Sequence, residues 1–545
     1  MKIKNYLLIA LIILVAAFLR FYHLGSLPPG LTWDEAAWGY NAYSIGIDGR
    51  DEFGRFLPYD YLESFGDYKP PMYAYLDVVP VKVFGLNEFA TRFPSALLGV
   101  LTVLITYFLV KRIFLNSKKA TSYALFSSSV LALSPWHILL SRAAFEANVA
   151  TFFIVFGIWL FLKGIQDKKI FLVLSFTSFV LSFYTFNTAR VVSPLIVLVL
   201  VLGFRKVLLK NKKYFFLACF VGLMLVLPIA RYLVSPQAQL RFKEVNIFSD
   251  PETVITLNQE VKNDGNQLWS KIIHNRRTAY SVLYLNHYFD NLNLNFLFVK
   301  GDNNPKFSIQ TVGQMYLFDL PFFLIGLIYL FRKRESNWWI IPLWLIVGII
   351  PAATARETPH ALRTEATLPT FQIIVAYGLV IFWSWTKKLR NLKLNKVLPL
   401  MVLILFIANF FYFLHSYLFH YSTSFSRDWQ YGSKDSIEYA KENIDNYDQI
   451  RYTTLLGRPY IYFLFYFKTD PKIFREKAVI EKDIFGFVTV SGFGKFLFAD
   501  NLHTPKKGNE KILYINDSRK VPKEAKILKN FYELDGNHIM TAYTL

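Results

Sequence analysis

The chain has 545 residues, of which 54% are hydrophobic and 18% charged, and its formal net charge is +21. This balance is too apolar for a soluble protein of this length and indicates a membrane protein. The positive charge does not indicate nucleic-acid binding, because Lys and Arg form short clusters between apolar runs and no continuous basic face. The single cysteine, Cys219, excludes an intramolecular disulfide and a cysteine-based metal site.

About eleven apolar runs approach the roughly 20 residues that a membrane-spanning helix needs. They cover approximately residues 5–22, 89–110, 120–140, 146–163, 170–186, 190–204, 214–233, 316–331, 338–354, 367–385 and 397–417. Prolines interrupt several of these runs, which spanning helices tolerate because neighbouring groups satisfy the freed backbone. The sequence therefore predicts a polytopic α-helical membrane protein.

Basic residues gather in alternate connections between these runs. The basic connections are residues 2–4, 111–119, 163–169, 205–213, 332–334 and 387–396. The short connections between them hold only Arg142, Arg190, Arg356 and Arg363. Because Lys and Arg are enriched in cytoplasmic loops, we expect the chain to start inside and end outside. Lys2 and Lys4 also fit a cleaved signal peptide, but Arg20 and the aromatic residues after it favour a retained outer-interface anchor.

Three outer segments are too long to be simple connectors: residues 23–88, 234–315 and 418–545. In the last, residues 433–446 have a helical pattern, while 449–455 and 512–515 have strand patterns. We expect a transmembrane domain over residues 1–417, with interfacial helices in the first two outer segments. Residues 418–545 are expected to form a small extracytoplasmic α/β domain.

An acidic pair, Asp34-Glu35, opens the first outer segment and lies beside Trp33, Trp38 and Tyr40. Thr32 followed by Glu35 is a capping box, so Glu35 is expected to satisfy backbone donors at a helix start. Asp34 is not needed for that cap. We therefore assign the chemistry to Asp34 and support to Glu35. The neighbouring aromatic rings could stack on a sugar.

Two basic residues, Lys69 and Arg92, follow the acidic pair in the sequence. Lys69 precedes Pro70-Pro71 and an apolar stretch, residues 74–84, which is too short to span and suits an interfacial helix. At headgroup depth Lys69 could bind a phosphate, or it could simply extend to the interface. Arg92 lies about one turn inside the second predicted span, where an unpaired charge is costly.

The remaining charged candidates share the outer level of the membrane. Arg142 and Glu146 flank the connection between the third and fourth runs, where an ordinary (i, i+4) pair is one interpretation. The other candidates are Arg190, Arg276, Arg277, Arg356, His360 and Arg363. Together they form a belt of cations around a few carboxylates, as a phosphate-bearing lipid substrate requires. A divalent ion shared by Asp34, Glu146 and a substrate phosphate is a further possibility; no other cofactor is indicated.

Motifs for other chemistries are missing from the sequence. It has no Gly-rich phosphate loop, no His-Glu-x-x-His zinc motif and no Gly-x-Ser-x-Gly nucleophile elbow. The nine histidines do not cluster. These absences leave the outer carboxylates and cations as the best candidates for a reaction site.

At these residues the sequence resembles the GT-C membrane glycosyltransferases that use a lipid carrier, including protein O-mannosyltransferases (glycosyltransferase family 39) and the aminoarabinose transferase of lipid A. The resemblance covers most of residues 1–417. Its motifs are Asp34-Glu35, Lys69-Pro70-Pro71, Glu88-Phe89-Ala90-x-Arg92-x-Pro94-Ser95-Ala96 and the connection from Ser141-Arg142 to Glu146. Residues 418–545 resemble the family's soluble outer domain only in position.

The resemblance implies specific roles for some of these residues. It makes Asp34 the catalytic base and Lys69 a contact of the carrier phosphate. The family connection often ends in Asp where this chain has Glu146, so that assignment is weaker. Residues 359–363 look like the late outer loop near the phosphate, without ranking Arg363 above Arg356. The implied reaction is inverting transfer of a sugar from a polyprenyl-phosphate carrier to an acceptor hydroxyl, on a lipid, glycan or protein, at the outer face of the cytoplasmic membrane.

Two other functions compete with this one. A transporter or flippase for lipid-linked sugars would place ionisable residues near mid-bilayer and show repeated halves, neither of which is evident. A receptor or scaffold with residues 418–545 as its binding module leaves the acid and cation set unexplained. The sequence identifies neither the sugar nor the acceptor.

Overall fold

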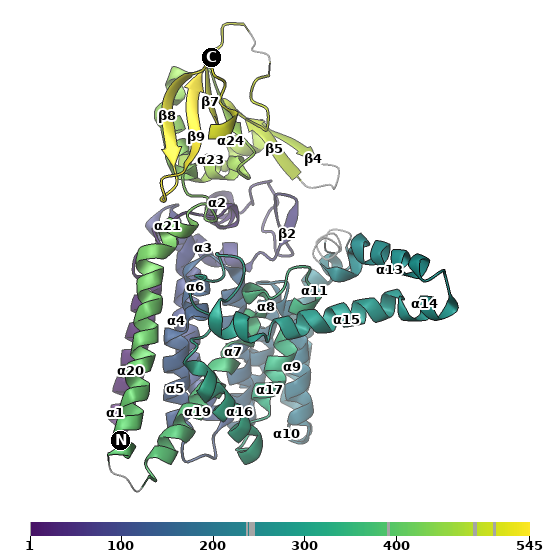
Figure 1. Ribbon diagram of the computed structural model, residues 1–545, viewed down its shortest axis with the longest axis vertical. Coiled ribbons are helices and arrows are strands. Elements are labelled where there is room, and N and C mark those ends of the chain that lie inside the picture. Colours follow the sequence, from purple (N-terminus) through teal and green to yellow (C-terminus); the bar gives the residue numbers. More distant parts are fainter. Residues whose placement is uncertain (1, 236–237, 239–245, 390–392, 483–487, 505–507) are drawn as a thin grey trace. The chain divides into compact units, whose positions relative to one another are not determined.

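The structure, a computed structural model, describes residues 2–235, 238, 246–389, 393–482, 488–504 and 508–545 (Figure 1). It divides into two compact units. Unit 1 comprises Met1–Phe18, Leu98–Leu140 and Ala147–Phe413. Unit 2 comprises Leu19–Leu97, Ser141–Glu146 and Leu414–Leu545. The domain boundary expected at residue 417 stays a prediction, and part of the second outer segment lies outside the described residues.

Unit 1 is helical. Its elements, some of which continue into unit 2, are α1 (Lys2–Phe21), α4 (Glu88–Ile113), α5 (Ala120–Leu133), α6 (Pro135–Arg142), α7 (Glu146–Gln166), α8 (Phe171–Phe183), α9 (Ala189–Gly203), α10 (Arg205–Lys210), α11 (Lys212–Leu233), η1 (Ile247–Ser249), α13 (Pro251–Asn263), α14 (Leu268–Ile273), α15 (Arg276–Asp290), η2 (Asn295–Val299), α16 (Asp319–Lys333), α17 (Ile340–Ile349), η3 (Ala352–Thr354), α18 (Ala361–Thr364), η4 (Glu365–Thr367), α19 (Thr370–Thr386) and α20 (Leu394–His415). Each apolar run of the sequence falls on a helix or a bent pair of helices.

Among the described residues, four helices are long and apolar enough to cross a bilayer: α4, α7, α11 and the continuous stretch Leu394–Phe425. Two bent pairs, α5 with α6 and residues 361–367 with α19, raise this number to six if each pair forms one span. Shorter apolar helices cover Asn5–Phe21, Phe171–Phe183, Ala189–Gly203 and Ile340–Thr354. The protein is therefore a membrane protein, while the total of eleven spans and the N-inside orientation stay predictions.

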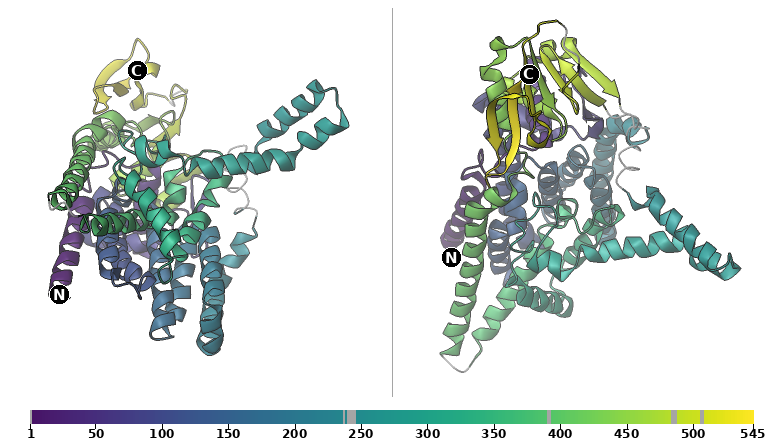
Figure 2. Two further views of the ribbon diagram at one scale, coloured as in Figure 1. Left: turned by 60° about the horizontal axis from the view of Figure 1, so that its bottom comes forward. Right: turned by 45° about the horizontal axis from the view of Figure 1, so that its top comes forward.

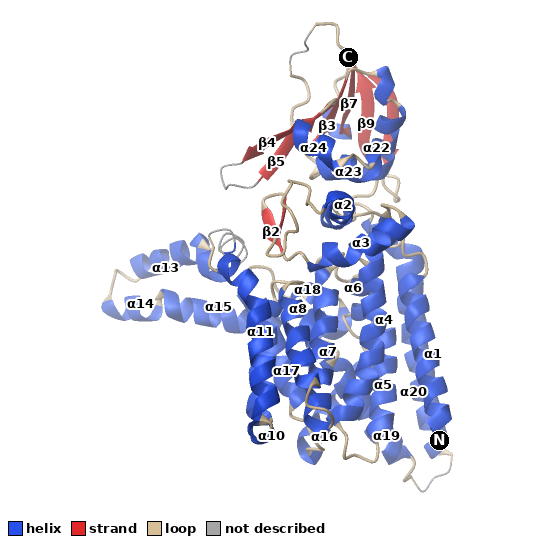
Figure 3. Ribbon diagram, turned by 180° about the vertical axis from the view of Figure 1, so that it is seen from behind, coloured by secondary structure: helices blue, strands red, loops and turns tan. Residues whose placement is uncertain are grey.

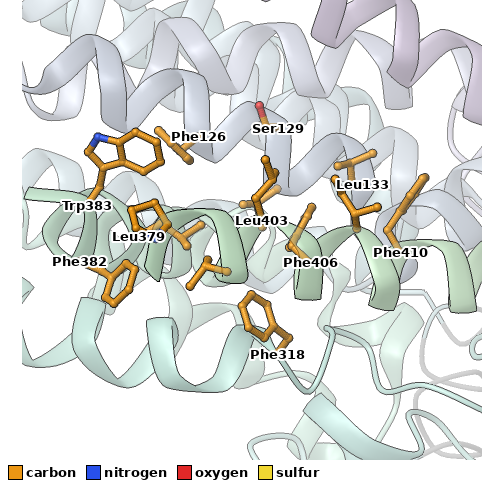
Figure 4. A pocket seen from close by; sticks show the side chains of 14 residues that line it. Phe126, Ser129, Leu133, Phe318, Leu379, Phe382, Trp383, Leu403, Phe406 and Phe410 are labelled. Carbon is orange, nitrogen blue, oxygen red and sulfur yellow. The ribbon is translucent and has the colours of Figure 1, made fainter. Parts of the chain in front are cut away.

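Unit 1 has two further features. Helices α13, α14 and α15 form an arm that projects from the bundle (Figure 2). A groove of about 350 Å³ lies between α5, α19 and α20 and is lined by side chains such as Phe126, Leu133, Trp383, Phe406 and Phe410 (Figure 4). Because Ser129 is the groove's one polar lining residue among the described side chains, it suits apolar chains rather than ionic chemistry.

Unit 2 combines the first outer segment with the C-terminal segment. Its other elements are α2 (Trp33–Asp48), β1 (Leu62–Ser64), β2 (Asp67–Lys69), α3 (Met72–Phe84), η5 (Ser416–His420), α21 (Tyr421–Phe425), α22 (Ser433–Glu442), η6 (Ile444–Asn446), β3 (Gln449–Thr453), α23 (Pro459–Phe467), α24 (Pro471–Lys477), β4 (Ala478–Lys482), β5 (Val488–Phe493), β6 (Phe496–Ala499), β7 (Ile512–Asp517), η7 (Ser518–Lys520), β8 (Lys526–Tyr532) and β9 (His538–Thr544). The expected C-terminal helix and both expected strands are present.

The C-terminal sheet is mixed, with strand order β4-β5-β6-β3-β7-β9-β8 (Figure 3). Strand β3 pairs in parallel with β6 and β7, and the remaining neighbours pair antiparallel. Helix α23, which follows β3, packs against α2 of the first outer segment. Tyr40 and Ala36 from α2 share one apolar core with Ile461 and Phe463 from α23. The C-terminal segment thus supports the helix that begins at the acidic pair.

Candidate active site

Helix α2 begins with the expected capping box. The Thr32 hydroxyl accepts a hydrogen bond from the Glu35 amide at 3.2 Å, and Glu35 Oε2 accepts one from the Thr32 amide at 3.0 Å. Two backbone donors of the helix N-terminus are satisfied in this way. The cap fixes the start of the helix and therefore the position of Asp34 in its first turn.

Glu35 is fully buried and pairs with Arg92 of α4. Its Oε1 lies 2.9 Å from Arg92 Nε and also accepts the Ala144 amide at 3.0 Å. The Arg92 guanidinium donates further to the carbonyls of Leu24, Pro28 and Gly30. Such a fully engaged buried carboxylate orders the surrounding chain and is not open to a substrate. Arg92 is therefore paired, as expected for a charge inside a predicted membrane span.

Asp34 differs from its neighbour in exposure. Its side chain is 52% exposed, and it forms an ion pair with Lys69, whose side chain is only 9% exposed. Lys69 ends β2 of a short hairpin in which it pairs with Leu62. The hairpin therefore brings a buried cation to an accessible carboxylate. This arrangement rules out the interpretation of Lys69 as a side chain that merely extends to the interface.

Lys69 is held in its charged form. Burial opposes the charge of the ammonium, but the carboxylates of Asp34 and Asp67 outweigh burial and keep the pKa of Lys69 above its ordinary value. Glu146 acts in the same direction. The Lys69 ammonium also lies 5.3 Å from the centroids of the Trp38 and Phe65 rings. Such aromatic contacts favour a cation.

The aromatic residues near Asp34 do not all remain free to stack on a sugar. Trp38 and Tyr40 are buried, and the Tyr40 hydroxyl donates to the Thr469 carbonyl at 3.0 Å. Trp38 packs against Tyr73 of α3. The proposed stacking role is wrong for these two residues, because their periodicity on α2 turns them into the core.

The Arg142 to Glu146 connection is not one continuous helix. Helix α6 ends at Arg142 and α7 begins at Glu146, so the simple (i, i+4) pair is not formed. Arg142 instead donates to the carbonyls of Leu19, Tyr22 and Leu27 and to the Tyr417 hydroxyl. It ties together backbone from distant parts of unit 2. Glu146 lies near enough to Lys69 to raise the pKa of that lysine.

A second buried carboxylate, Glu52, connects the parts that carry Asp34 and Lys69. Glu52 Oε1 accepts hydrogen bonds from Asn41 of α2 at 3.3 Å and from Ser64 of β1 at 2.8 Å. Burial raises the pKa of Glu52 to about 8. The sequence did not single out this residue, because its partners lie 11 and 12 positions away and form no local motif.

All five predicted phosphate-binding arginines lie in unit 1, and four of them differ in their surroundings as follows. Arg190 donates to Asn187 Oδ1 at 2.7 Å and to the Phe183 carbonyl at 3.2 Å. Arg356 is exposed and donates to the carbonyls of residues 246 and 249. Arg276 and Arg277 are exposed at the start of α15. Arg190 and Arg356 thus support local backbone, whereas Arg276 and Arg277 are exposed on the arm.

His360 is buried directly before α18 of unit 1, and Arg363 lies half-buried within that helix. The His360 ring packs on Phe307 at 5.0 Å, and burial, reinforced by the charge of Arg363, lowers the pKa of His360 to about 3. Asp302 accepts the Ala361 amide at 2.6 Å, and burial raises its pKa to about 6. His360 is therefore neutral at physiological pH, so it adds no positive charge to the belt.

Metal-ligating side chains do not gather in the part of the chain that the structure describes. No three His, Cys, Asp or Glu side chains there lie close enough together to hold a metal ion. Asp34 and Glu146 would supply only two protein ligands to a divalent ion. In the hypothesis from the sequence, the third ligand is the substrate phosphate. Lys69 already supplies a cation to Asp34.

Comparison with known proteins confirms the resemblance. Residues 68–232 match the family described as dolichyl-phosphate-mannose-protein mannosyltransferase. An Aquifex aeolicus protein described as uncharacterized is 34% identical over 171 residues, 31% of each chain. The polyprenol-phosphate-mannose–protein mannosyltransferase of Mycobacterium tuberculosis is 26% identical over 160 residues, 28% of each chain. The matched segments therefore span less than a third of these two relatives.

The similarity in structure extends over nearly the whole chain. Crystal structures of ArnT from Cupriavidus metallidurans, in the apo state and bound to undecaprenyl phosphate, match with a TM-score of 0.58 each. Sequence identity is 13% and 12%, and the matches cover 99% and 98% of this chain and 98% and 97% of ArnT. The chain therefore has the GT-C fold, with a C-terminal domain built on a sheet.

Proposed function

We propose that the protein is an inverting glycosyltransferase that moves a sugar from a polyprenyl-phosphate carrier to an acceptor hydroxyl. The observation that carries the proposal is the pairing of an accessible carboxylate, Asp34, with a buried cation, Lys69, in a GT-C fold. Support also comes from the solved ArnT complex with undecaprenyl phosphate and from the mannosyltransferase match. We place the reaction at the extracytoplasmic face of the cytoplasmic membrane, on the distribution of basic loops.

In the proposed reaction Asp34 accepts the proton of the acceptor hydroxyl as the oxygen attacks the anomeric carbon. The bond from that carbon to the carrier phosphate breaks, and its electron pair stays on the phosphate oxygen. A single displacement inverts the anomeric configuration. The departing phosphate gains negative charge and needs cations more than a general acid. Lys69 is the cation best placed beside Asp34 to supply this stabilisation.

Other residues receive supporting roles in this proposal. Glu35 and Arg92 fix the start of α2 and with it the position of Asp34. Arg142 holds the backbone around them, and Glu146 contributes charge near Lys69. The arginines of unit 1, namely Arg190, Arg276, Arg277, Arg356 and Arg363, stay candidate contacts of the carrier phosphate, while neutral His360 supports its own loop.

A divalent ion bound by Asp34, Glu146 and the substrate phosphate is an alternative way to supply positive charge. It requires Asp34 to exchange its Lys69 contact for the metal. Dialysis of the enzyme against EDTA distinguishes the two: loss of activity that Mg²⁺ or Mn²⁺ restores supports the ion, and unchanged activity supports Lys69 alone.

The proposal is tested by reconstituting the protein in vesicles with undecaprenyl-phosphate [¹⁴C]mannose and an extract of bacterial envelope. Transfer is expected to release free undecaprenyl phosphate together with labelled lipid, glycan or protein. Repeating the assay with carriers of other sugars identifies the preferred donor. If labelled donor crosses the vesicle membrane without release of the phosphate carrier, the protein is a flippase and the proposal is wrong.

A further inference from the structure

Arg458 places a cation from the C-terminal domain beside the candidate site. It lies at the end of the loop between β3 and α23. Its guanidinium carbon is 5.0 Å from the centroid of the Phe65 ring, and the same centroid is 5.3 Å from the Lys69 ammonium. One aromatic ring therefore contacts both cations, although they are distant in sequence.

Phe65 occupies a backbone conformation that its side chain does not favour. It forms the turn of the β1–β2 hairpin with Gly66, and their φ angles are 60° and 75°. Such turns favour Asn-Gly, since a bulky residue at positive φ is strained. The Phe65 ring is nevertheless buried and packs edge-on against Tyr460 at 5.7 Å. Strain of this kind persists where the surrounding structure holds it and is common at ligand sites.

The guanidinium of Arg458 has no anionic partner among the described residues. It makes no hydrogen bond or ion pair there, although its side chain is partly buried. Three other buried or partly buried arginines of unit 2 are bonded: Arg92 to Glu35, Arg142 to carbonyls and Arg475 to Asp48. A partly buried guanidinium with five free donors is suited to an anion that arrives with a ligand.

The loop that carries Arg458 also contacts the residue that precedes the acidic pair. Gly457, with φ 129°, lies so close to Trp33 that a Cβ atom there would be 3.0 Å from the indole ring. Trp33 is the residue before Asp34. The loop thus packs beside the start of α2 through Gly457 and beside the Lys69 hairpin through Arg458.

We propose that Arg458 is a second phosphate-binding residue of this site, so that the C-terminal domain takes part in binding the lipid carrier. This inference rests on the proposed function. A donor phosphodiester carries one negative charge, and the phosphomonoester released by transfer carries up to two. Arg458 therefore stabilises the carrier phosphate most strongly after the bond to the sugar breaks.

Direct binding of the carrier, without any sugar, tests this role. The full chain in detergent is titrated with undecaprenyl phosphate, with undecaprenol, which lacks the phosphate, and with inorganic phosphate. Arg458→Gln removes the charge and Arg458→Lys keeps it. Lys529→Gln is the matched control, because Lys529 also lies over aromatic rings, those of Tyr439 and Phe531, in the same sheet domain.

We expect wild type to bind undecaprenyl phosphate more tightly than undecaprenol. Arg458→Gln should weaken undecaprenyl-phosphate binding by about tenfold or more, the usual range for a charge-assisted hydrogen bond. Arg458→Lys should recover part of the loss, and Lys529→Gln should bind as wild type. Binding of undecaprenol should be the same in all four proteins.

Three results overturn the inference in different ways. If Arg458→Gln binds undecaprenyl phosphate as wild type does, Arg458 has no role and the proposed function stands. If wild type does not prefer undecaprenyl phosphate to undecaprenol, the proposed carrier and this inference fail together. If inorganic phosphate competes at equal concentration, the site binds free phosphate and not a lipid carrier.

Discussion

The ammonium of Lys69 forms an ion pair with the carboxylate of Asp34, across 35 positions of sequence. The pair stabilises the ionised carboxylate, the form that accepts a proton. It also keeps a cation where a departing phosphate needs one. In the proposed reaction Lys69 therefore turns from Asp34 toward the phosphate as the proton arrives on Asp34.

Replacing Lys69 should affect the chemical step more than folding. We expect Lys69→Ala to lower kcat by about 100-fold or more, because it removes a charge aimed at the departing phosphate. Lys69→Arg should retain part of the activity. Lys82→Ala, an exposed lysine of α3, is the control and should be neutral. If the Lys69→Ala protein transferred sugar at the normal rate in the vesicle assay, Lys69 would have no role in the chemical step.

Replacing Glu35 should instead destabilise the protein. Glu35→Gln leaves the buried Arg92 guanidinium without its carboxylate, which typically costs about 3–5 kcal/mol. The expected result is a lower Tm in detergent and a lower folded yield. Adding Arg92→Met to Glu35→Gln should recover part of that loss. A Glu35→Gln protein with normal Tm and no activity would show that Glu35 takes part in the chemistry.

Glu52 should make stability depend on pH. Its pKa is about 8 in the folded chain against an ordinary 4.5, so the unfolded chain releases the proton in this interval while the folded chain keeps it. Stability contributed by the protonated form is therefore lost as pH rises from 4.5 to 8. Glu52→Gln should flatten this decline in chemical unfolding measured across that range. If the stability of Glu52→Gln declined with pH as steeply as that of wild type, Glu52 would not be a buried, protonated carboxyl.

The link that Glu52 makes between Asn41 and Ser64 predicts a separate effect on activity. Glu52→Gln keeps a carbonyl acceptor for both donors, whereas Glu52→Ala removes it. We expect Glu52→Ala to lower kcat by about tenfold because small displacements of a positioned group are costly. Glu442→Ala, exposed on α22, serves as the control. Equal activity of the two Glu52 variants would show that the link does not position Lys69.

The arginines of the arm allow a test that stability does not complicate. Because Arg276 and Arg277 are exposed, replacing both by Ala should change the free energy of unfolding by no more than about 0.5 kcal/mol. If they contact the carrier phosphate, the KM for the lipid donor should rise at least about threefold. Lys271→Ala, on the neighbouring α14, is the control. An unchanged KM would show that Arg276 and Arg277 do not contact the carrier phosphate.

Local patterns predicted much of the fold. Apolar runs coincide with helices, and Thr32 with Glu35 forms the capping box that their spacing indicates. These features depend on neighbours within a few residues, so a sequence displays them directly. The same holds for the strand patterns that became β3 and β7.

Contacts between distant segments could not be predicted in this way. The sequence placed Asp34 and Lys69 at one level of the membrane but did not show that they touch. It gave no sign that Glu52 joins α2 to β1, or that the Phe65 ring contacts both Lys69 and Arg458. It also offered Trp38 and Tyr40 as sugar platforms, whereas packing of α2 against α3 and α23 buries both. Such outcomes depend on tertiary packing, which periodicity does not encode.

The most direct test of the central claim compares wild type with Asp34→Asn in the vesicle transfer assay, with undecaprenyl-phosphate binding measured on the same preparations. Asp445→Asn, an exposed aspartate of unit 2, is the control and should be fully active. We predict that Asp34→Asn still binds undecaprenyl phosphate but transfers sugar at least about 100-fold more slowly, since the base is lost. Full transfer activity in Asp34→Asn would contradict the claim that this carboxylate is the catalytic base.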